Sequence, residues 1–181
     1  KNELGLDIVS SAAEAKTFYG AGSMLADMVD AFKAANTINE LYCVSLDDNG
    51  AGVQSAGDFT IGGAPTAAGT LRMYIAGKRA EIAVAVGDTA EDIAANMQAV
   101  ISADADMLVT AVINGVTVEQ IDLTAKNDGE PGNDIDIRFN YVDGDETPAG
   151  VTTAFTAMAG GSANPDVSSV FAILDDTQYI L

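Results

Sequence analysis

Glycines near the start of the chain form the pattern closest to a known binding motif. The stretch Gly20-Ala21-Gly22-Ser23-Met24-Leu25 begins like the phosphate-binding loop of dinucleotide-binding proteins. That loop follows a strand, and its third glycine allows close packing of the next helix. Here the stretch follows an expected helix, and Leu25 stands where the third glycine would be. One helix that ends and a second that begins explain the pattern better than a cofactor site.

Two acidic turns are the candidate calcium sites. In Asp47-Asp48-Asn49-Gly50, placing Gly50 at the sixth position of a calcium loop puts Ala56 where a bidentate glutamate belongs. The second turn, Asp143-Gly144-Asp145-Glu146, has carboxylates but no second set of ligands nearby in the sequence. We expect solvated turns, with weak calcium binding at the second turn as the alternative.

Catalytic constellations are missing as well. The 181 residues include no histidine, which excludes His-dependent triads, His general bases and His-ligated metals. The lysines and serines form no recognisable nucleophile motif. A glycosidase uses a pair of carboxylates, but a chain with 27 Asp and Glu residues contains such pairs by chance. A carboxylate pair is therefore no evidence for glycosidase activity here. We therefore assign no catalytic, cofactor-binding or metal-ligating residue, and we expect a protein that is not an enzyme and needs no cofactor.

The composition of the chain limits the kinds of partner and environment that we expect. The formal charge of −19 disfavours nucleic-acid binding, which needs a positive field. Cys43 is the single cysteine and lies in an apolar run, so we expect it to pack in a core. No apolar stretch approaches the roughly 18 residues of a membrane span. Because the chain begins at Lys1 and ends in what reads as an interrupted strand at 179–181, we interpret it as an internal fragment of a longer protein.

Helix and strand patterns alternate at both ends of the chain. Strands are expected at 6–9 and 40–46, with one helix between Ser11 and Gly20 and another after the N-cap candidate Ser23. After residue 163 a similar pattern returns. Asn164 is the expected N-cap, followed by Pro165 and by apolar residues at helical spacing: Val167, Val170, Phe171 and Leu174.

Residues 51–162 have a different character, with the alternation typical of antiparallel sheets. Strands are expected at 58–62, 70–76, 79–86, 107–113, 116–124, 134–141 and 151–158. Gly77-Lys78 fits a two-residue type II′ turn, and Asn114-Gly115 is a strong signal for a short hairpin. One amphipathic helix, capped by Asp88 or Thr89, is expected at about 88–102.

These patterns predict an α/β plus α+β protein with two domains. The first is a discontinuous α/β portion, residues 1–50 and 163–181, in which the strands at 40–46 and 179–181 are neighbours. The second is an inserted α+β domain, residues 51–162, mostly antiparallel with one helix. The junctions near 47–57 and 159–164 are rich in Gly, Asp, Ser and Asn, which suits insertion points.

A binding module is one function open to the inserted domain. A Thr-rich antiparallel domain that faces outward can present aromatic side chains to a host surface or a protein partner. The aromatics available are Phe59, Tyr74, Phe139, Tyr141 and Phe155. Their spacing along strands favours core packing over a binding platform.

Segments throughout the chain carry a resemblance to a known family. They are Phe18-Tyr19-Gly20-Ala21-Gly22-Ser23-Met24-Leu25-Ala26, Glu40-Leu41-Tyr42, Leu46-Asp47-Asp48, Gly69-Thr70-Leu71, Tyr74-Ile75-Ala76-Gly77-Lys78-Arg79, Gly87-Asp88-Thr89-Ala90, Gly129-Glu130-Pro131-Gly132-Asn133-Asp134-Ile135-Asp136-Ile137-Arg138, Met158-Ala159-Gly160-Gly161 and Asn164-Pro165-Asp166. As an ordered set, they resemble the contractile tail sheath protein of Mu-like phages and prophages. The family has no active-site motif, so no catalytic role is carried over.

The resemblance implies a structural subunit that polymerises around the tail tube and contracts to drive the tube through the host envelope. It implies other sheath subunits and the tail tube protein as partners, a place in the virion tail, and assembly in the bacterial host cytoplasm. In such families an α/β core forms the tube wall, inserted domains project outward, and terminal arms link subunits. Without those arms, we expect the isolated chain to be a monomer.

Overall fold

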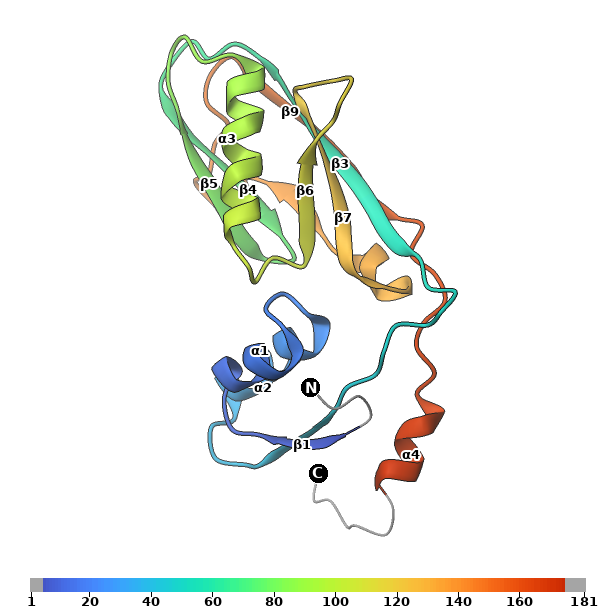
Figure 1. Cartoon of the computed structure of the whole chain (residues 1–181). Helices are drawn as coiled ribbons and strands as arrows, with labels where there is room; N and C mark the ends of the chain where they lie inside the picture. Colours follow the sequence, from blue (N-terminus) through green and yellow to red (C-terminus); the bar gives the residue numbers. More distant parts are fainter. Residues whose placement is uncertain (1–4, 175–181) are drawn as a thin grey trace.

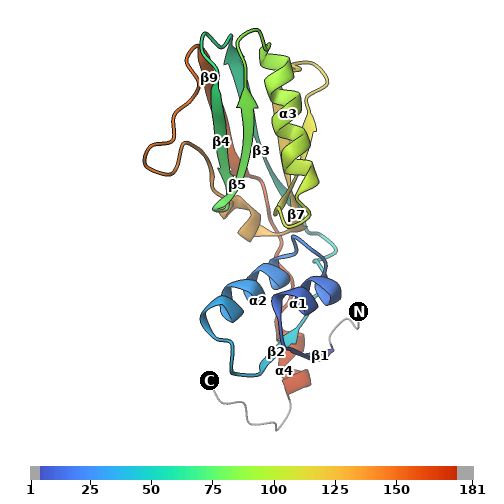
Figure 2. The same cartoon turned by 90° about the vertical axis from the view of Figure 1, so that its left-hand side faces the viewer.

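The computed structural model describes residues 5–174, which form two lobes joined by two segments of chain (Figures 1 and 2). The small lobe comprises residues 5–46, and the large lobe comprises residues 53–162. Helix α4 (Ser168–Leu174) lies at the small-lobe end of the molecule.

In the small lobe, two helices connect two short strands. The order is β1 (Leu6–Val9), α1 (Ala12–Tyr19), α2 (Met24–Ala35) and β2 (Leu41–Val44). Both helices begin as the sequence predicts, because Glu14 N–H donates to Ser11 Oγ and Ala26 N–H donates to Ser23 Oγ. The elements bury a small apolar cluster: Val9, Ala15, Ala26, Val29 and Cys43. The predicted core position of Cys43 is confirmed.

The α/β prediction for residues 1–50 needs a correction. Strands β1 and β2 pair antiparallel, with Leu6 opposite Val44, whereas an α/β unit has parallel strands. Both expected helices lie between these strands, whereas a parallel pair is usually joined by a single helix, so here the second strand runs antiparallel to the first. The strand predicted at 179–181 beside β2 lies outside the described residues.

The large lobe holds two antiparallel sheets. One has the order β6-β7-β3-β9, formed by Val109–Ile113, Gln120–Asp128, Gln54–Gly63 and Val151–Ala159. The other has the order β5-β4-β8, formed by Lys78–Val84, Gly69–Ile75 and Ile137–Phe139. The described residues therefore show an α+β fold with antiparallel sheets, as predicted for this part of the chain.

Helix α3 (Ala90–Ala103) packs between β5 and β6 and helps to close the core between the sheets (Figures 1 and 2). It begins with a complete capping box, in which Thr89 and Asp92 each accept a hydrogen bond from the other's backbone N–H. Its inner face and both sheets bury one apolar cluster, which includes Ile93, Met97, Ile101, Phe59, Leu71, Met73, Ile121 and Leu123. No helix in residues 5–174 has the length and apolar character that a bilayer crossing requires.

The turn predicted at Gly77-Lys78 is displaced by one residue. Ile75 pairs with Lys78, so Ala76 and Gly77 form the turn. Both have positive φ, 50° and 78°, which is typical of type I′ rather than the predicted type II′.

The hairpin predicted around Asn114-Gly115 forms with a longer loop. Ile113 pairs with Ile121 and β7 begins at Gln120, so residues 114–119 connect the strands. Asn114 Oδ1 accepts hydrogen bonds from the N–H groups of Val116 and Thr117, so this asparagine stabilises a wider turn.

Two further predictions are corrected in their boundaries. The strand predicted at 134–141 is preceded by the short 3-10 helix η1 (Glu130–Asp134), and β8 covers only Ile137–Phe139. Asn164 does not cap the last helix, because its Oδ1 accepts the Glu130 N–H. Asp166 Oδ1 instead accepts the N–H of Ser168, where α4 begins.

Candidate functional site: the junction between the lobes

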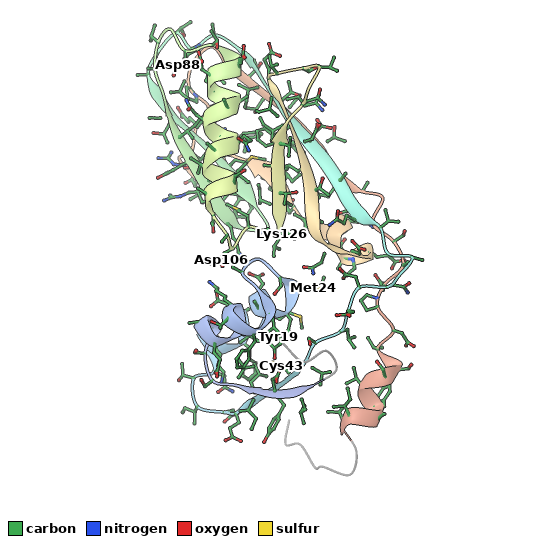
Figure 3. All side chains as sticks on the ribbon, viewed as in Figure 1. Tyr19, Met24, Cys43, Asp88, Asp106 and Lys126 are labelled. Carbon is green, nitrogen blue, oxygen red and sulfur yellow. The ribbon has the colours of Figure 1, made fainter. Side chains whose placement is uncertain are left out.

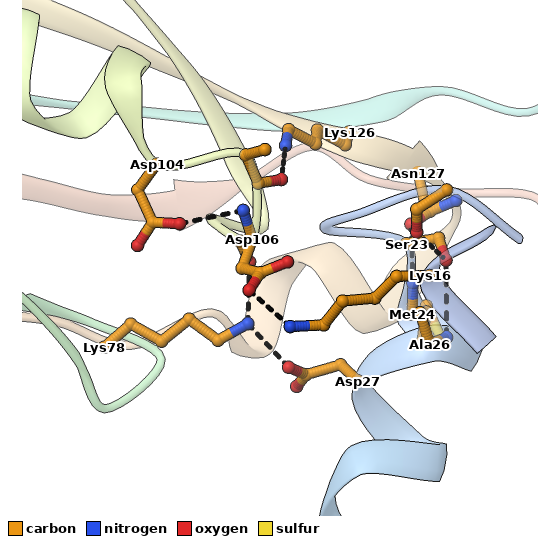
Figure 4. A network of polar contacts seen from close by, with 12 residues as sticks. Lys16, Ser23, Met24, Ala26, Asp27, Lys78, Asp104, Asp106, Lys126 and Asn127 are labelled. Atoms are coloured by element: carbon orange, nitrogen blue, oxygen red, sulfur yellow. Dashed lines mark hydrogen bonds and ion pairs between the residues drawn. The ribbon is translucent and has the colours of Figure 1, made fainter. Parts of the chain in front are cut away.

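Polar side chains and main-chain groups from both lobes meet where α1 and α2 approach the loop that follows α3 (Figures 3 and 4). We call this set the junction. Its members in the small lobe are Lys16, Gly22, Met24 and Asp27, and those in the large lobe are Lys78, Asp104, Ala105, Asp106, Lys126 and Asn127.

Two ion pairs cross the junction. Lys16 Nζ lies 2.5 Å from Asp106 Oδ2, and Lys78 Nζ lies 2.6 Å from Asp27 Oδ1. The hydrogen bond between Lys16 and Asp106 lowers the pKa of the Asp106 carboxyl and raises the pKa of the Lys16 ammonium group. All four side chains are between 27% and 40% exposed, so salt screens both pairs.

Lysines also bind the main chain of the loop after α3. Lys78 Nζ donates to the Asp106 carbonyl oxygen at 2.6 Å, and Lys126 Nζ donates to the Ala105 carbonyl oxygen at 2.8 Å. Burial lowers the pKa of Lys126. Within the loop, Asp106 N–H donates to Asp104 Oδ1 at 2.9 Å. Side chains from α1, β5 and β7 therefore hold one loop in place.

The main chains of the two lobes approach each other closely at Gly22, between α1 and α2. Its φ is +74°, and a Cβ atom there would lie 2.4 Å from the Met107 carbonyl oxygen. A side chain at this position would force the lobes apart. Next to it, Met24 N–H donates to Asn127 Oδ1 at 3.1 Å. The glycine that looks like part of a cofactor loop thus serves a turn and a close contact.

The two segments that connect the lobes run side by side. Val53 and Ser162 exchange two backbone hydrogen bonds, of 3.0 and 3.2 Å. Nearby, Asn49 Nδ2 donates to the Asn164 carbonyl oxygen at 3.1 Å. The chain therefore leaves and re-enters the small-lobe end of the molecule at one place, and Asp47-Asp48-Asn49-Gly50 belongs to this connection.

A groove of about 530 Å³ lies next to the junction, between α2 and the connecting segments. Its lining is largely apolar and includes Met24, Met28, Leu46, Pro131, Pro165 and Val167. Among the described residues, Tyr19 is the one aromatic side chain in this lining. None of the five aromatic residues that the sequence offers for a binding platform lines this groove.

In the second acidic turn, Asp143, Gly144 and Glu146 are exposed, as expected of a solvated turn, and only the Asp145 side chain is largely covered. Asp145 is 11% exposed; its carboxylate accepts the Tyr74 hydroxyl at 2.7 Å and lies 3.2 Å from Arg72 Nη1. These contacts hold the loop after β8 against β4. Within residues 5–174, no group of three or more His, Cys, Asp or Glu side chains is arranged to hold a metal ion.

The five aromatic residues lie in different environments. Phe59 is fully buried and makes an edge contact with Phe139, with ring centroids 5.7 Å apart, which confirms their predicted core packing. Tyr74 is covered by Tyr141, with centroids 5.8 Å apart, and Phe155 is half exposed.

Comparison with known proteins relates the chain to a phage protein. Over 160 residues it is 43% identical to the Mu-like prophage FluMu tail sheath protein of Haemophilus influenzae. The resemblance to Mu-like tail sheath proteins is confirmed. The match covers 88% of this chain but 32% of the relative, so the chain spans about a third of that protein's length. The sequence matches no protein-family model.

Sequence patterns do not predict the junction, because its residues follow no motif spacing. Lys16 and Asp106 are 90 residues apart, and Lys78 and Asp27 are 51 residues apart. The one signal in the sequence is the small number of lysines. The chain has 27 acidic residues and five lysines, and three of those lysines lie at the junction. Chemically, this arrangement is suited to fixing the position of two lobes.

Proposed function

We propose that this chain is a segment of the structural subunit of a contractile phage tail sheath. The observation that carries the proposal is the 43% identity over 160 residues to a tail sheath protein. Since the chain spans 32% of that relative, the activity belongs to a longer polypeptide. That polypeptide polymerises around the tail tube and contracts to drive the tube through the host envelope. It is a non-enzymatic component of the virion tail, assembled in the host cytoplasm, and it needs no cofactor.

The proposed division places residues 1–50 and 163–181 in a discontinuous core portion of the sheath and residues 51–162 in an inserted domain. Two observations support it. The lobes have separate apolar clusters, one around Phe59 and one around Val29. The connecting segments also lie together at Val53 and Ser162, as the two ends of an insertion must.

Sheath contraction requires subunits to move relative to one another as largely rigid bodies. The proposed partners are therefore other sheath subunits and the tail tube protein, and no nucleic acid. A net charge of −19 keeps the free subunit soluble and resists unplanned association. We expect the isolated chain to be monomeric by light scattering at moderate salt, and a stable high-order oligomer would contradict this.

Negative-stain electron microscopy tests the sheath proposal. The product of the complete gene that encodes this chain is purified with and without the neighbouring tail proteins. Hollow helical tubes or striated sheaths are expected. If only dispersed particles form with the tail proteins present, the sheath proposal fails, and an outward-facing binding module becomes the function to test by ligand screening.

A further inference from the structure

All three arginines of the chain lie on the outer face of the three-stranded sheet β5-β4-β8. Alternate residues of β4 are buried in the core, so Arg72 and Tyr74 belong to the opposite face. The strand register then places Arg79 of β5 and Arg138 of β8 on either side of Tyr74. The guanidinium groups of the chain are thus concentrated on one face, where the carboxylates of Glu81, Asp136 and Asp145 pair with them.

All three arginines form ion pairs within the chain, and Arg79 and Arg138 are also half exposed, so a partner can reach them. The side chains of Arg79 and Arg138 are 54% and 55% exposed. Each lies near one carboxylate through its Nε atom, Glu81 at 3.6 Å and Asp136 at 2.6 Å. Tyr141 lies against Arg138, with 5.3 Å from the guanidinium carbon to the ring centroid, and is itself half exposed. We call Arg79, Arg138 and Tyr141 the arginine face; arginine and tyrosine are residue types that often dominate interface energies.

The other sheet carries a complementary feature on its own outer face. Asp58 of β3 and Asp122 of β7 lie directly opposite each other in the strand register. Like charges at such positions destabilise a sheet. Asp122 accepts hydrogen bonds from Asn114 and Gln120, but among the described residues neither aspartate has a lysine or arginine within ion-pair distance. We call Asp58 and Asp122 the aspartate face. Its neighbours in the register are uncharged: Thr60, Val112, Gln120, Thr124 and Thr156.

We propose that the arginine face of one copy of this chain binds the aspartate face of a second copy. Guanidinium groups pair with carboxylates through two parallel hydrogen bonds, and the contact relieves the repulsion between Asp58 and Asp122. The two sheets share one core, so their outer faces point away from each other. Each copy therefore still presents one of the two residue sets to the next copy, and the contact propagates head to tail.

This inference rests on the proposed function, because in a sheath polymer the contact between copies is repeated many times. A weak contact then suffices, and it agrees with a monomeric chain in dilute solution. The contact itself needs only two copies of this chain, so it can be tested apart from sheath assembly.

The test uses amide chemical shifts of the ¹⁵N-labelled chain, followed as its concentration is raised to about 1 mM at physiological salt, where charges beyond about 8 Å are screened. Concentration-dependent shifts are expected on both faces. Arg138→Glu and Asp122→Lys should each weaken the association about tenfold or more. An equimolar mixture of these two variants should restore it, because each variant then meets a face of opposite charge. Lys33→Glu, on α2 in the small lobe, makes the same charge change as Arg138→Glu away from both faces and should leave the association unchanged.

Circular dichroism melting is the control that checks whether each variant is folded. No shifts on either face in the native chain, or shifts that both variants leave intact, would overturn the inference, as would a mixture that fails to recover. Tube formation by the complete gene product is scored separately. If the complete gene product forms tubes but the chain shows no contact between the two faces, this inference alone is rejected. If the mixture of charge-swapped variants restores the association but the complete gene product forms no tubes, the sheath proposal alone is rejected.

Discussion

Lys78 Nζ lies 2.6 Å from Asp27 Oδ1, and this contact joins the first residue of β5 to the first turn of α2. The same ammonium group donates to the Asp106 carbonyl oxygen. One side chain therefore ties the small lobe to two parts of the large lobe. Each lobe has its own apolar core, and the junction itself is built largely from polar contacts. We expect the lobes to change their relative orientation at a lower cost than either lobe unfolds.

Replacing Lys78 tests this expectation. Lys78→Ala should broaden the distribution of lobe orientations, measured by small-angle X-ray scattering, while lowering the free energy of unfolding by about 1 kcal/mol or less, because exposed ion pairs contribute little. Lys33→Ala is the control, since Lys33 Nζ donates to the Asn39 carbonyl oxygen within the small lobe. Equal scattering changes in both variants would contradict the role given to Lys78.

Gly22 should tolerate alanine less well than Gly20. Both have positive φ, and Gly20 also has ψ of 141°, outside the left-handed helical region, so alanine costs each roughly 1–3 kcal/mol in backbone conformation. A Cβ at Gly22 also lies 2.4 Å from the Met107 carbonyl oxygen, whereas a Cβ at Gly20 has nothing within 4 Å. Gly22→Ala should therefore cost about 1–3 kcal/mol more in urea unfolding, or separate the lobes in scattering. Equal effects at both positions would show that the close approach does not matter.

Helix α3 should contribute to the core through one face. Met97 is fully buried, so Met97→Ala is expected to lower the free energy of unfolding by about 2–5 kcal/mol through lost contacts and a cavity. Val100 is partly exposed on the same helix, and Val100→Ala should cost less than about 1 kcal/mol. Denaturant titration of the two variants measures the difference. A similar loss in both would contradict the assigned buried face.

The capping box predicts a pH dependence. The hydroxyl and N–H groups of Thr89 donate to the Asp92 carboxylate and hold its pKa below the ordinary value. A pKa that is lowered in the folded state stabilises the fold above the unfolded-state pKa of about 3.9. That stabilisation is lost as pH falls through the folded-state value. The Tm difference between native chain and Asp92→Asn should therefore be largest near neutral pH and shrink below about pH 4.

A matched control removes the charge of Glu91 and leaves the capping box of Thr89 and Asp92 intact. Glu91→Gln, in the same first turn of α3, should change Tm less than Asp92→Asn at neutral pH. A Tm difference for Asp92→Asn that stays constant from pH 7 to acid would argue against an ionised cap.

Local signals in the sequence determined much of the secondary structure. Ser11, Ser23 and Thr89 mark helix starts, because a capping side chain bonds to a backbone N–H only a few residues away. The alternation in β4 and β5 marks which side chains enter the core. Together with the ordered segments that resemble a tail sheath, these signals suffice for the main elements and for the family resemblance.

Tertiary structure alone decided how those elements pair and where the lobes meet. The antiparallel β1–β2 pair, the turn at Ala76 and Gly77, and the late start of α4 depend on register and on partners far along the chain. The junction is the clearest case, because Lys16 reaches Asp106 across 90 residues of sequence. A salt bridge requires two charges within about 4 Å and no fixed spacing in sequence, so only the folded chain reveals it.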